Sequence, residues 1–178
     1  MPRLKVILLS GAFLALPAKA EIPVGSVAPD FTAQASLGGK EFSFHLADAL
    51  KTGPVVLYFY PAAFTPGCTI EAHEFAEAAN EFKKLGATVI GVSHDPIDKL
   101  DRFSVSECRS KFAVAADADQ AIEKAYGAVM PDEKGYASRT SFVIGSDGNI
   151  AYVYGNPDPS RHVENSLEAV RKLKGTAK

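Results

Sequence analysis

Residues 54–60, with the sequence PVVLYFY, constrain the fold of this 178-residue chain more than any other segment. An unbroken run of apolar, β-branched and aromatic residues suits a strand that is covered on both faces, as in a parallel sheet. A second run of this kind, TVIGVS, follows at residues 88–93. Between the two runs, apolar side chains recur at helical spacing over residues 69–85, and Gly86 is a stop signal. These segments predict a β-α-β unit with a right-handed crossover.

The remaining pattern extends this unit into a larger α/β domain. Further strands are predicted at residues 112–115, 141–144 and 150–154, and further helices at 97–108, 119–126 and 160–173. Near the start, two short strand patterns at 31–35 and 41–45 flank Leu37-Gly38-Gly39, which predicts an added β-hairpin. The order of elements resembles a thioredoxin-like α/β fold with an N-terminal β-hairpin extension.

The first twenty residues have the features of a secretory signal. A basic start precedes an apolar run at residues 6–16, and the segment ends in the small-residue pattern Ala18-Lys19-Ala20. The alternative, a membrane anchor, is disfavoured because a membrane span needs about 20 apolar residues. We therefore predict cleavage after Ala20, a single domain at residues 21–178, and export to an oxidising compartment, the periplasm.

The charge balance limits the possible partners. Three of the 19 basic residues and none of the 21 acidic ones lie in residues 1–20, so the rest carries 16 basic against 21 acidic groups. Without a basic face, we expect no nucleic-acid partner, and we expect no membrane partner. Two cysteines are too few for a disulfide scaffold or a four-cysteine zinc site. His45 and His162 show no constellation, and we expect neither a metal nor a cofactor.

Cys68 is the strongest candidate for a reactive residue. It follows the first long strand and the turn Pro66-Gly67, and it falls in the first turn of the predicted helix. Ligands of open α/β sheets bind beyond the carboxyl ends of the strands. The free N–H groups and partial positive charge of a helix N-terminus favour a thiolate, the reactive form of cysteine. Thr65 could place a hydroxyl beside the sulfur. The alternative is that Cys68 is a small buried core residue.

The residues around Cys68 resemble a known family. The pattern Pro61-x-x-x-Thr65-x-x-Cys68 matches the peroxidatic signature of the peroxiredoxins, and the wider stretch YFYP…TPGCT…EA resembles the peroxiredoxin Q, or bacterioferritin comigratory protein, subfamily. The opening VGxxAPDF and the later segment RxSFVI, followed by Asp147-Gly148, are also similar to this subfamily. The resemblance covers nearly the whole chain after the signal.

The resemblance implies a thiol peroxidase and assigns roles to individual residues. Cys68 would be the nucleophile, Thr65 would hydrogen-bond the sulfur and the peroxide oxygen, and Pro61 would shield the thiolate from water. Arg139 would stabilise the thiolate and the transition state, for which its planar fork of donors is suited. Glu71 would either hold Arg139 in place or merely favour the helix N-terminus.

Two departures from the subfamily pattern concern recycling and substrate preference. Many members carry a second cysteine five residues after the first, where this chain has His73. His73 could tune Cys68, or it could be an ordinary polar residue near the helix surface; His94 could line the edge of the site. Cys108 is the only other thiol, and the subfamily implies that it resolves the oxidised Cys68; the alternative is a one-cysteine enzyme. Ala62-Ala63-Phe64 replaces a more polar stretch, which leaves the preferred peroxide open.

Three classes of function remain to be compared. The leading one is a peroxidase for hydrogen peroxide and organic hydroperoxides, recycled by a thioredoxin-like reductant and acting as a monomer, with a weak dimer as the alternative. A thiol–disulfide exchange protein would need Cys-x-x-Cys, but its first position here is Thr65. A binding domain with a structural disulfide between Cys68 and Cys108 would not need the threonine and the arginine.

Overall fold

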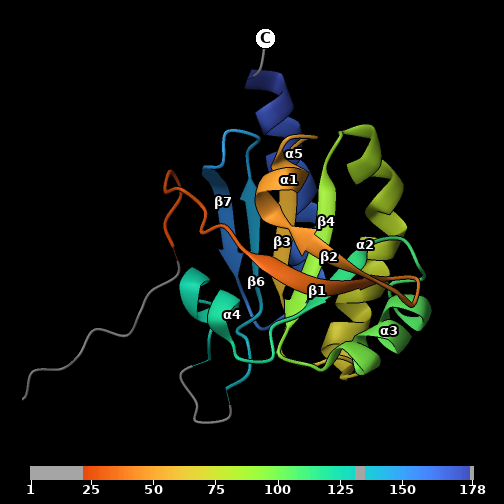
Figure 1. The fold of residues 1–178 in the computed structure, drawn as a ribbon. Helices are drawn as coiled ribbons and strands as arrows, with labels where there is room; N and C mark the ends of the chain where they lie inside the picture. The colour runs from red at the N-terminus through yellow and green to blue at the C-terminus, as the bar shows by residue number, and fades with distance from the viewer. Residues whose placement is uncertain (1–21, 131–134, 177–178) are drawn as a thin grey trace, which may run out of the picture.

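The computed structural model describes residues 22–130 and 135–176, so the predicted signal segment lies outside the described residues. The chain forms one mixed sheet with strand order β2-β1-β5-β4-β3-β6-β7 and helices on both faces (Figure 1). The strands are β1 (Thr32–Leu37), β2 (Lys40–His45), β3 (Val55–Phe59), β4 (Thr88–Ser93), β5 (Ala113–Ala116), β6 (Thr140–Ile144) and β7 (Ile150–Gly155). The helices are α1 (Leu46–Leu50), α2 (Pro66–Lys84), α3 (Ile97–Ser106), α4 (Ala121–Tyr126), the 3-10 helix η1 (Pro159–Arg161) and α5 (His162–Thr176).

Strand β3 is the centre of the sheet, as its composition predicts. It pairs in parallel with β4 and antiparallel with β6, and all five of its residues are buried. Because side chains alternate along a strand, Val56 and Tyr58 face a core closed by α2, α3 and α5. Val55 and Leu57 face the opposite core, together with residues of α1 and α4. The carboxyl end of β3, where Cys68 follows, therefore lies between two packed layers.

Helix α2 begins earlier than predicted, at Pro66 rather than at residue 69. Thr65 is the N-cap, and proline is favoured at the first helical position because its missing N–H would be unpaired there in any case. At the other end, Gly86 adopts φ +71°, and the Gly86 and Ala87 amides donate to the Lys83 and Phe82 carbonyls. This is a Schellman ending, which is the stop that Gly86 predicted.

The N-terminal hairpin is confirmed and extends the sheet at β5. Strand β1 pairs antiparallel with both β2 and β5, and Gly38-Gly39 forms the two-residue turn with φ angles of +59° and +76°. Such a turn requires left-handed backbone, which glycine adopts without strain. The Gly38 amide donates to the Ser104 hydroxyl at 2.7 Å, so the turn rests on the end of α3.

Several boundaries and one element differ from the sequence predictions. The five-residue helix α1 was not predicted, because so short a segment carries little periodicity. Helix α3 ends at Ser106, so Cys108 lies two residues beyond the helix instead of inside it. The last predicted helix is divided into η1 and α5. Among the described residues, none of the helices is long and apolar enough to cross a membrane.

Candidate active site

Cys68 lies in the first turn of α2 and is 2% exposed. The first hydrogen bond of the helix joins the Thr69 amide to the Thr65 carbonyl at 2.9 Å, so the Gly67 and Cys68 amides precede the helical ladder. Such amides and the helix dipole favour negative charge at this end. The helix thus brings the sulfur to the carboxyl end of β3, as the sequence predicts.

Arg139 approaches the sulfur from the residue just before β6. Its Nη2 donates to Cys68 Sγ at 3.5 Å, and its Nε donates to the Pro157 carbonyl at 3.0 Å. A Cβ atom at Gly67 would lie 3.1 Å from Nη2, so glycine leaves room for the guanidinium against the helix. The Arg139 side chain is 6% exposed, which gives the thiol a fixed cation in a nearly dry site.

Glu71, one turn along α2 from Cys68, is fully buried and contacts the guanidinium of Arg139. The Arg139 Nη1 group donates to Glu71 Oε2. Burial raises the pKa of Glu71 to about 8, although the arginine opposes this shift. Burial also opposes the charge of Arg139, but Glu71 and Cys68 together raise the pKa of the guanidinium. The guanidinium therefore bridges the thiol and the carboxyl group.

His162 joins this cluster, so the prediction that it has no constellation is wrong. It is fully buried, its Nδ1 lies 2.8 Å from Ser141 Oγ, and its Nε2 lies 2.9 Å from the Asn156 carbonyl. The same Nδ1 is 3.6 Å from Glu71 Oε1. Burial, and then the charge of Arg139, lower the pKa of His162. The sequence does not predict the contact of His162 with Glu71, because the two residues lie 91 positions apart along the chain.

The loop between β3 and α2 is held from a neighbouring strand end. Asp95, which follows β4, accepts from the Ala63 amide at 2.6 Å and from the Ser93 hydroxyl at 2.9 Å. Its other oxygen contacts Lys99 at 2.6 Å. Asp95 is only 4% exposed and was not predicted as a site residue. Its position after a buried strand, at the edge where ligands bind, was the available signal.

Thr65, Pro61 and His94 have less contact with the sulfur than the predictions suggest. The Thr65 hydroxyl donates to the Ala62 carbonyl at 2.9 Å, which orients its oxygen without using the thiol. Pro61 is half-buried directly after Tyr60. His94 packs against the Tyr136 ring. In the part of the chain that is described, no group of three or more His, Cys, Asp or Glu side chains could hold a metal ion.

Comparison with known proteins agrees with this geometry. The AhpC/TSA family matches residues 24–153. A putative peroxiredoxin bcp of Helicobacter pylori is 36% identical over 84% of this chain and 99% of its own length. A chloroplastic peroxiredoxin Q of Triticum aestivum is 33% identical over 86% of this chain and 69% of its own. The crystal structure of peroxidoxin BcpB from Mycobacterium tuberculosis superposes with a TM-score of 0.76 at 31% identity, covering 84% of this chain and 96% of that one.

The chain belongs to the AhpC/TSA family and is a peroxiredoxin. Its relatives are of the peroxiredoxin Q and bcp type, as the sequence motifs predict, and its fold is the thioredoxin-like fold of these proteins. The peroxiredoxin is therefore a thiol-dependent peroxidase, and enzymes of this family act on peroxides with thioredoxin-like reductants.

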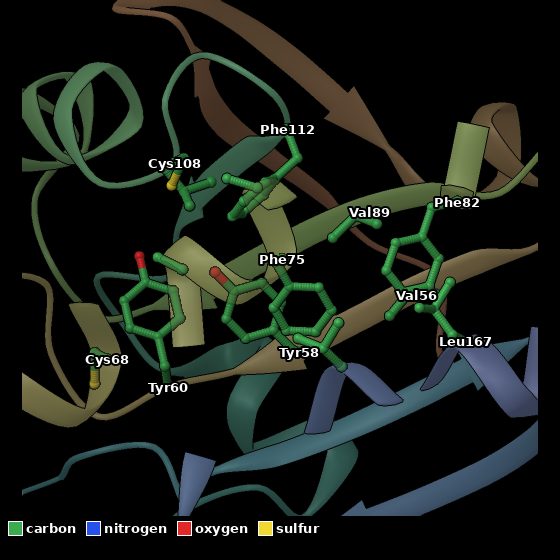
Figure 2. Packing of buried hydrophobic residues seen from close by; sticks show 14 of the residues in the cluster. Val56, Tyr58, Tyr60, Cys68, Phe75, Phe82, Val89, Cys108, Phe112 and Leu167 are labelled. Carbon is green, nitrogen blue, oxygen red and sulfur yellow. The ribbon is translucent and has the colours of Figure 1, made fainter. Parts of the chain in front are cut away.

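The second cysteine of the peroxiredoxin is free and fully buried, as is typical of a core residue. Cys108 packs in the core that contains Tyr60, Phe103 and Phe112. Burial, and then the neighbouring charge of Glu107, raise the pKa of the Cys108 thiol. In Figure 2 the ring of Tyr60 lies between the two cysteines. Burial raises the pKa of the Tyr60 hydroxyl, and Cys108 and Cys68 are both close enough to add to this shift.

His73, which replaces the second cysteine of many relatives, contacts the Cys108 segment instead of Cys68. Its Nε2 lies 2.8 Å from Glu107 Oε2. One turn further along α2, Glu77 accepts from Arg109 at 3.2 Å. These two side-chain contacts therefore hold the residues on either side of Cys108 against α2, the helix that carries Cys68.

Proposed function

We propose that Cys68 is the peroxidatic nucleophile of this thiol peroxidase. The contact of Arg139 Nη2 with its sulfur, at the N-terminus of α2, is the observation that supports this role. The thiolate attacks one peroxide oxygen, the O–O bond breaks, and the leaving oxygen takes a proton to give an alcohol or water. Cys68 is left as a sulfenic acid. Both negative centres of this reaction lie near a guanidinium and helix amides.

Four other residues complete the proposed site. Arg139 has donors beyond those used by Glu71 and Pro157, and these are available to the polarised peroxide oxygens. The Thr65 hydroxyl, oriented by its bond to Ala62, offers an oxygen that accepts from the peroxide O–H. Pro61 covers the approach and has no N–H to hydrogen-bond water. Glu71 holds Arg139 in place through the hydrogen bond that its Oε2 accepts from Arg139 Nη1.

Recycling, in this proposal, uses Cys108. The Cys108 thiol attacks the Cys68 sulfenic acid, a disulfide forms and water leaves. A thioredoxin-like dithiol then reduces the disulfide and is itself oxidised. The two sulfurs are free and buried in different parts of one core, with the Tyr60 ring in between, so this step requires local opening.

The segment after Cys108 is suited to such an opening. Arg109 and Ser110 adopt positive φ angles of 50° and 55°, a conformation that costs a non-glycine residue about 1–2 kcal/mol. Phe64, four residues before Cys68, also has a positive φ of 68°. Strained backbone therefore lies beside both cysteines. The release of this strain offsets part of the free energy needed to move the cysteines out of the core.

The substrates in this proposal are hydrogen peroxide and organic hydroperoxides, and the enzyme acts as a monomer. Residues 1–20 direct its export, so a thioredoxin-like reductant of the same compartment would recycle it. Purification from the producing cell and N-terminal sequencing test the export: Glu21 as the first residue supports it. An intact Met1 on cytosolic protein contradicts it.

The central experiment combines two variants with mass spectrometry. Reduced wild-type protein and the Cys68→Ser and Cys108→Ser variants receive one equivalent of hydrogen peroxide, followed by peptide mapping. We expect a Cys68–Cys108 disulfide in the wild type, a Cys68 sulfenic acid in Cys108→Ser, and no peroxide consumption by Cys68→Ser. Peroxide consumption by a folded Cys68→Ser would contradict the nucleophile. Stable sulfenic acid in the wild type, with Cys108 free, would make this a one-cysteine enzyme.

A further inference from the structure

Glu71 Oε1 is a buried oxygen without a hydrogen-bond partner among the described residues, whereas Oε2 of the same carboxyl group accepts from Arg139. The polar atom that faces Oε1 is His162 Nδ1, at 3.6 Å. His162 in turn is fixed by the Asn156 carbonyl, and the Asn156 amide donates to the Arg139 carbonyl at 3.1 Å. The histidine, the carboxyl group and the arginine thus form a closed buried ring behind Cys68.

The hydrogen bonds of His162 determine its tautomer. A carbonyl oxygen can only accept, so Nε2, which faces the Asn156 carbonyl, carries the proton. Burial and Arg139 lower the pKa of His162 and keep the ring neutral, and Nδ1 then presents a lone pair. Ser141 Oγ and Glu71 Oε1 both face this lone pair. A lone pair repels a carboxylate oxygen but accepts a hydrogen bond from a protonated carboxyl group.

The protonation of Glu71 changes what Arg139 offers to the sulfur. An ionised Glu71 neutralises the guanidinium, whereas a protonated Glu71 leaves the full positive charge for the Cys68 thiolate. Building on the proposed roles of Cys68 and Arg139, we propose that His162 is a positioning residue that keeps a proton on Glu71 Oε1, and so reserves the charge of Arg139 for Cys68.

Other ionisable groups face Glu71 and His162, and they are the same in the wild type and in the variants used below. Arg139, Glu74 and Tyr58 influence Glu71. Arg139 and Asp158 influence His162, and the centre of the Tyr154 ring lies 4.8 Å from that of the imidazole. The loss of the proton from Glu71 should appear as a fall in the rate constant for peroxide at high pH, because the negative charge of Glu71 then offsets the positive charge of Arg139.

The test is the pH profile of the second-order rate constant with hydrogen peroxide for two substitutions at one position. His162→Gln keeps an amide near the Nε2 position but removes the acceptor that faces Oε1, whereas His162→Asn keeps an acceptor near the Nδ1 position. We expect the fall in rate to begin at lower pH in His162→Gln. At pH values above the fall, the rate constant of this variant should be about tenfold lower than that of the wild type for each pH unit by which the fall has moved. His162→Asn should keep the fall near its wild-type position.

Two further variants separate this role from a merely structural one. Ser141→Ala removes the hydrogen bond between the Ser141 hydroxyl and Nδ1 but leaves the acceptor that faces Oε1, so it is the matched control and should not move the fall to lower pH. Glu71→Gln cannot ionise, so it should lack the fall, and His162→Gln should add no further pH effect in that background.

The outcomes distinguish this inference from the proposed function. A fall that persists in Glu71→Gln, or that stays in place in a folded His162→Gln, overturns the inference while Cys68→Ser remains inactive. Activity of Cys68→Ser in the same assay would instead overturn the proposed function. If His162→Gln does not fold, a fall that persists in Glu71→Gln still overturns the inference, because Glu71 is then not the group that titrates.

Discussion

The two cysteines of this protein are almost equally buried, yet their surroundings differ in every respect that matters for reactivity. Cys68 lies in the first turn of a helix, 3.5 Å from a guanidinium that a carboxyl group holds in place. Cys108 lies past the end of a helix among aromatic rings, and its neighbour Glu107 has the same charge as a thiolate. Burial alone therefore does not distinguish the proposed nucleophile from the second cysteine, whereas the position of a cation and of helix amides does.

The largest expected effect comes from removing the cation at Cys68. Arg139→Ala should lower the second-order rate constant with hydrogen peroxide by about 10²–10³, the loss that follows deletion of one stabilising donor in other enzymes. Stopped-flow measurement on reduced protein checks this value. Arg171→Ala, which removes a surface arginine paired with Glu81, is the control and should react like the wild type. A wild-type rate in Arg139→Ala would remove the main difference between the two cysteines.

Alkylation of the native, reduced protein compares the two thiols directly. We expect iodoacetamide to modify Cys68 first, because burial raises the pKa of Cys108 and so leaves less of this thiol ionised, about tenfold less for each unit by which its pKa rises. Quantitative peptide mapping against time gives both rates. In denaturant the two rates should converge, because the folded surroundings cause the difference. Equal rates in the folded protein would contradict the comparison.

The sequence predicted the framework of the Cys68 site better than its interior. The run at β3, the stop at Gly86 and the turn before Cys68 are local signals, since each depends on residues adjacent in the chain. The cluster behind the sulfur is not local: Glu71, Arg139 and His162 meet only because α2, β6 and α5 pack together. Glu71 and Arg139 were found through family motifs, whereas His162 had neither a motif nor a spacing that pointed to it.

The Cys108 region was harder to predict for a different reason. The helical pattern continues to residue 108, but the backbone leaves the helix at Ser106 and then adopts two left-handed residues. Arginine and serine, at residues 109 and 110, do not predict a left-handed conformation, whereas glycine would. With this conformation the Ser110 amide donates a hydrogen bond to the Ser104 carbonyl at 2.9 Å, which closes the chain back onto the end of α3.

The free energy of unfolding of serine variants should distinguish the surroundings of Cys68 from those of Cys108. A serine at residue 108 places a hydroxyl among aromatic rings, so Cys108→Ser should be less stable than Cys108→Ala by about 1–3 kcal/mol. At residue 68, Arg139 lies within reach of the hydroxyl, so Cys68→Ser should be no less stable than Cys68→Ala. Chemical denaturation of the four variants checks both orders. A Cys108→Ser variant as stable as Cys108→Ala would mean that the serine pairs with the buried hydroxyl of Tyr58 or Tyr60, neither of which has a hydrogen-bond partner among the described residues.

The smallest expected effect concerns the two side-chain contacts that hold the Cys108 segment on α2. His73 and Glu77 contact Glu107 and Arg109, and exposed pairs of this kind contribute about 0.2–1 kcal/mol each. If recycling requires this segment to leave α2, His73→Ala and Glu77→Ala should each speed formation of the Cys68–Cys108 disulfide by about 1.4- to 5-fold, the same energies expressed as rates. Samples quenched at intervals after a peroxide pulse and analysed by mass spectrometry give the rate. The rate of peroxide consumption should not change, because neither residue contacts the Cys68 sulfur.

Glu81→Ala on the same helix is the matched control for this prediction. Glu81 pairs with Arg171 of α5 at 2.6 Å and has no part in holding the Cys108 segment. A faster disulfide in all three variants would indicate a general loosening of α2. A faster disulfide in His73→Ala and Glu77→Ala alone would show that the second cysteine is restrained at its edges. The concealment of Cys108 would then depend on two surface contacts as well as on its aromatic core, and the reactivity of Cys68 would not depend on them.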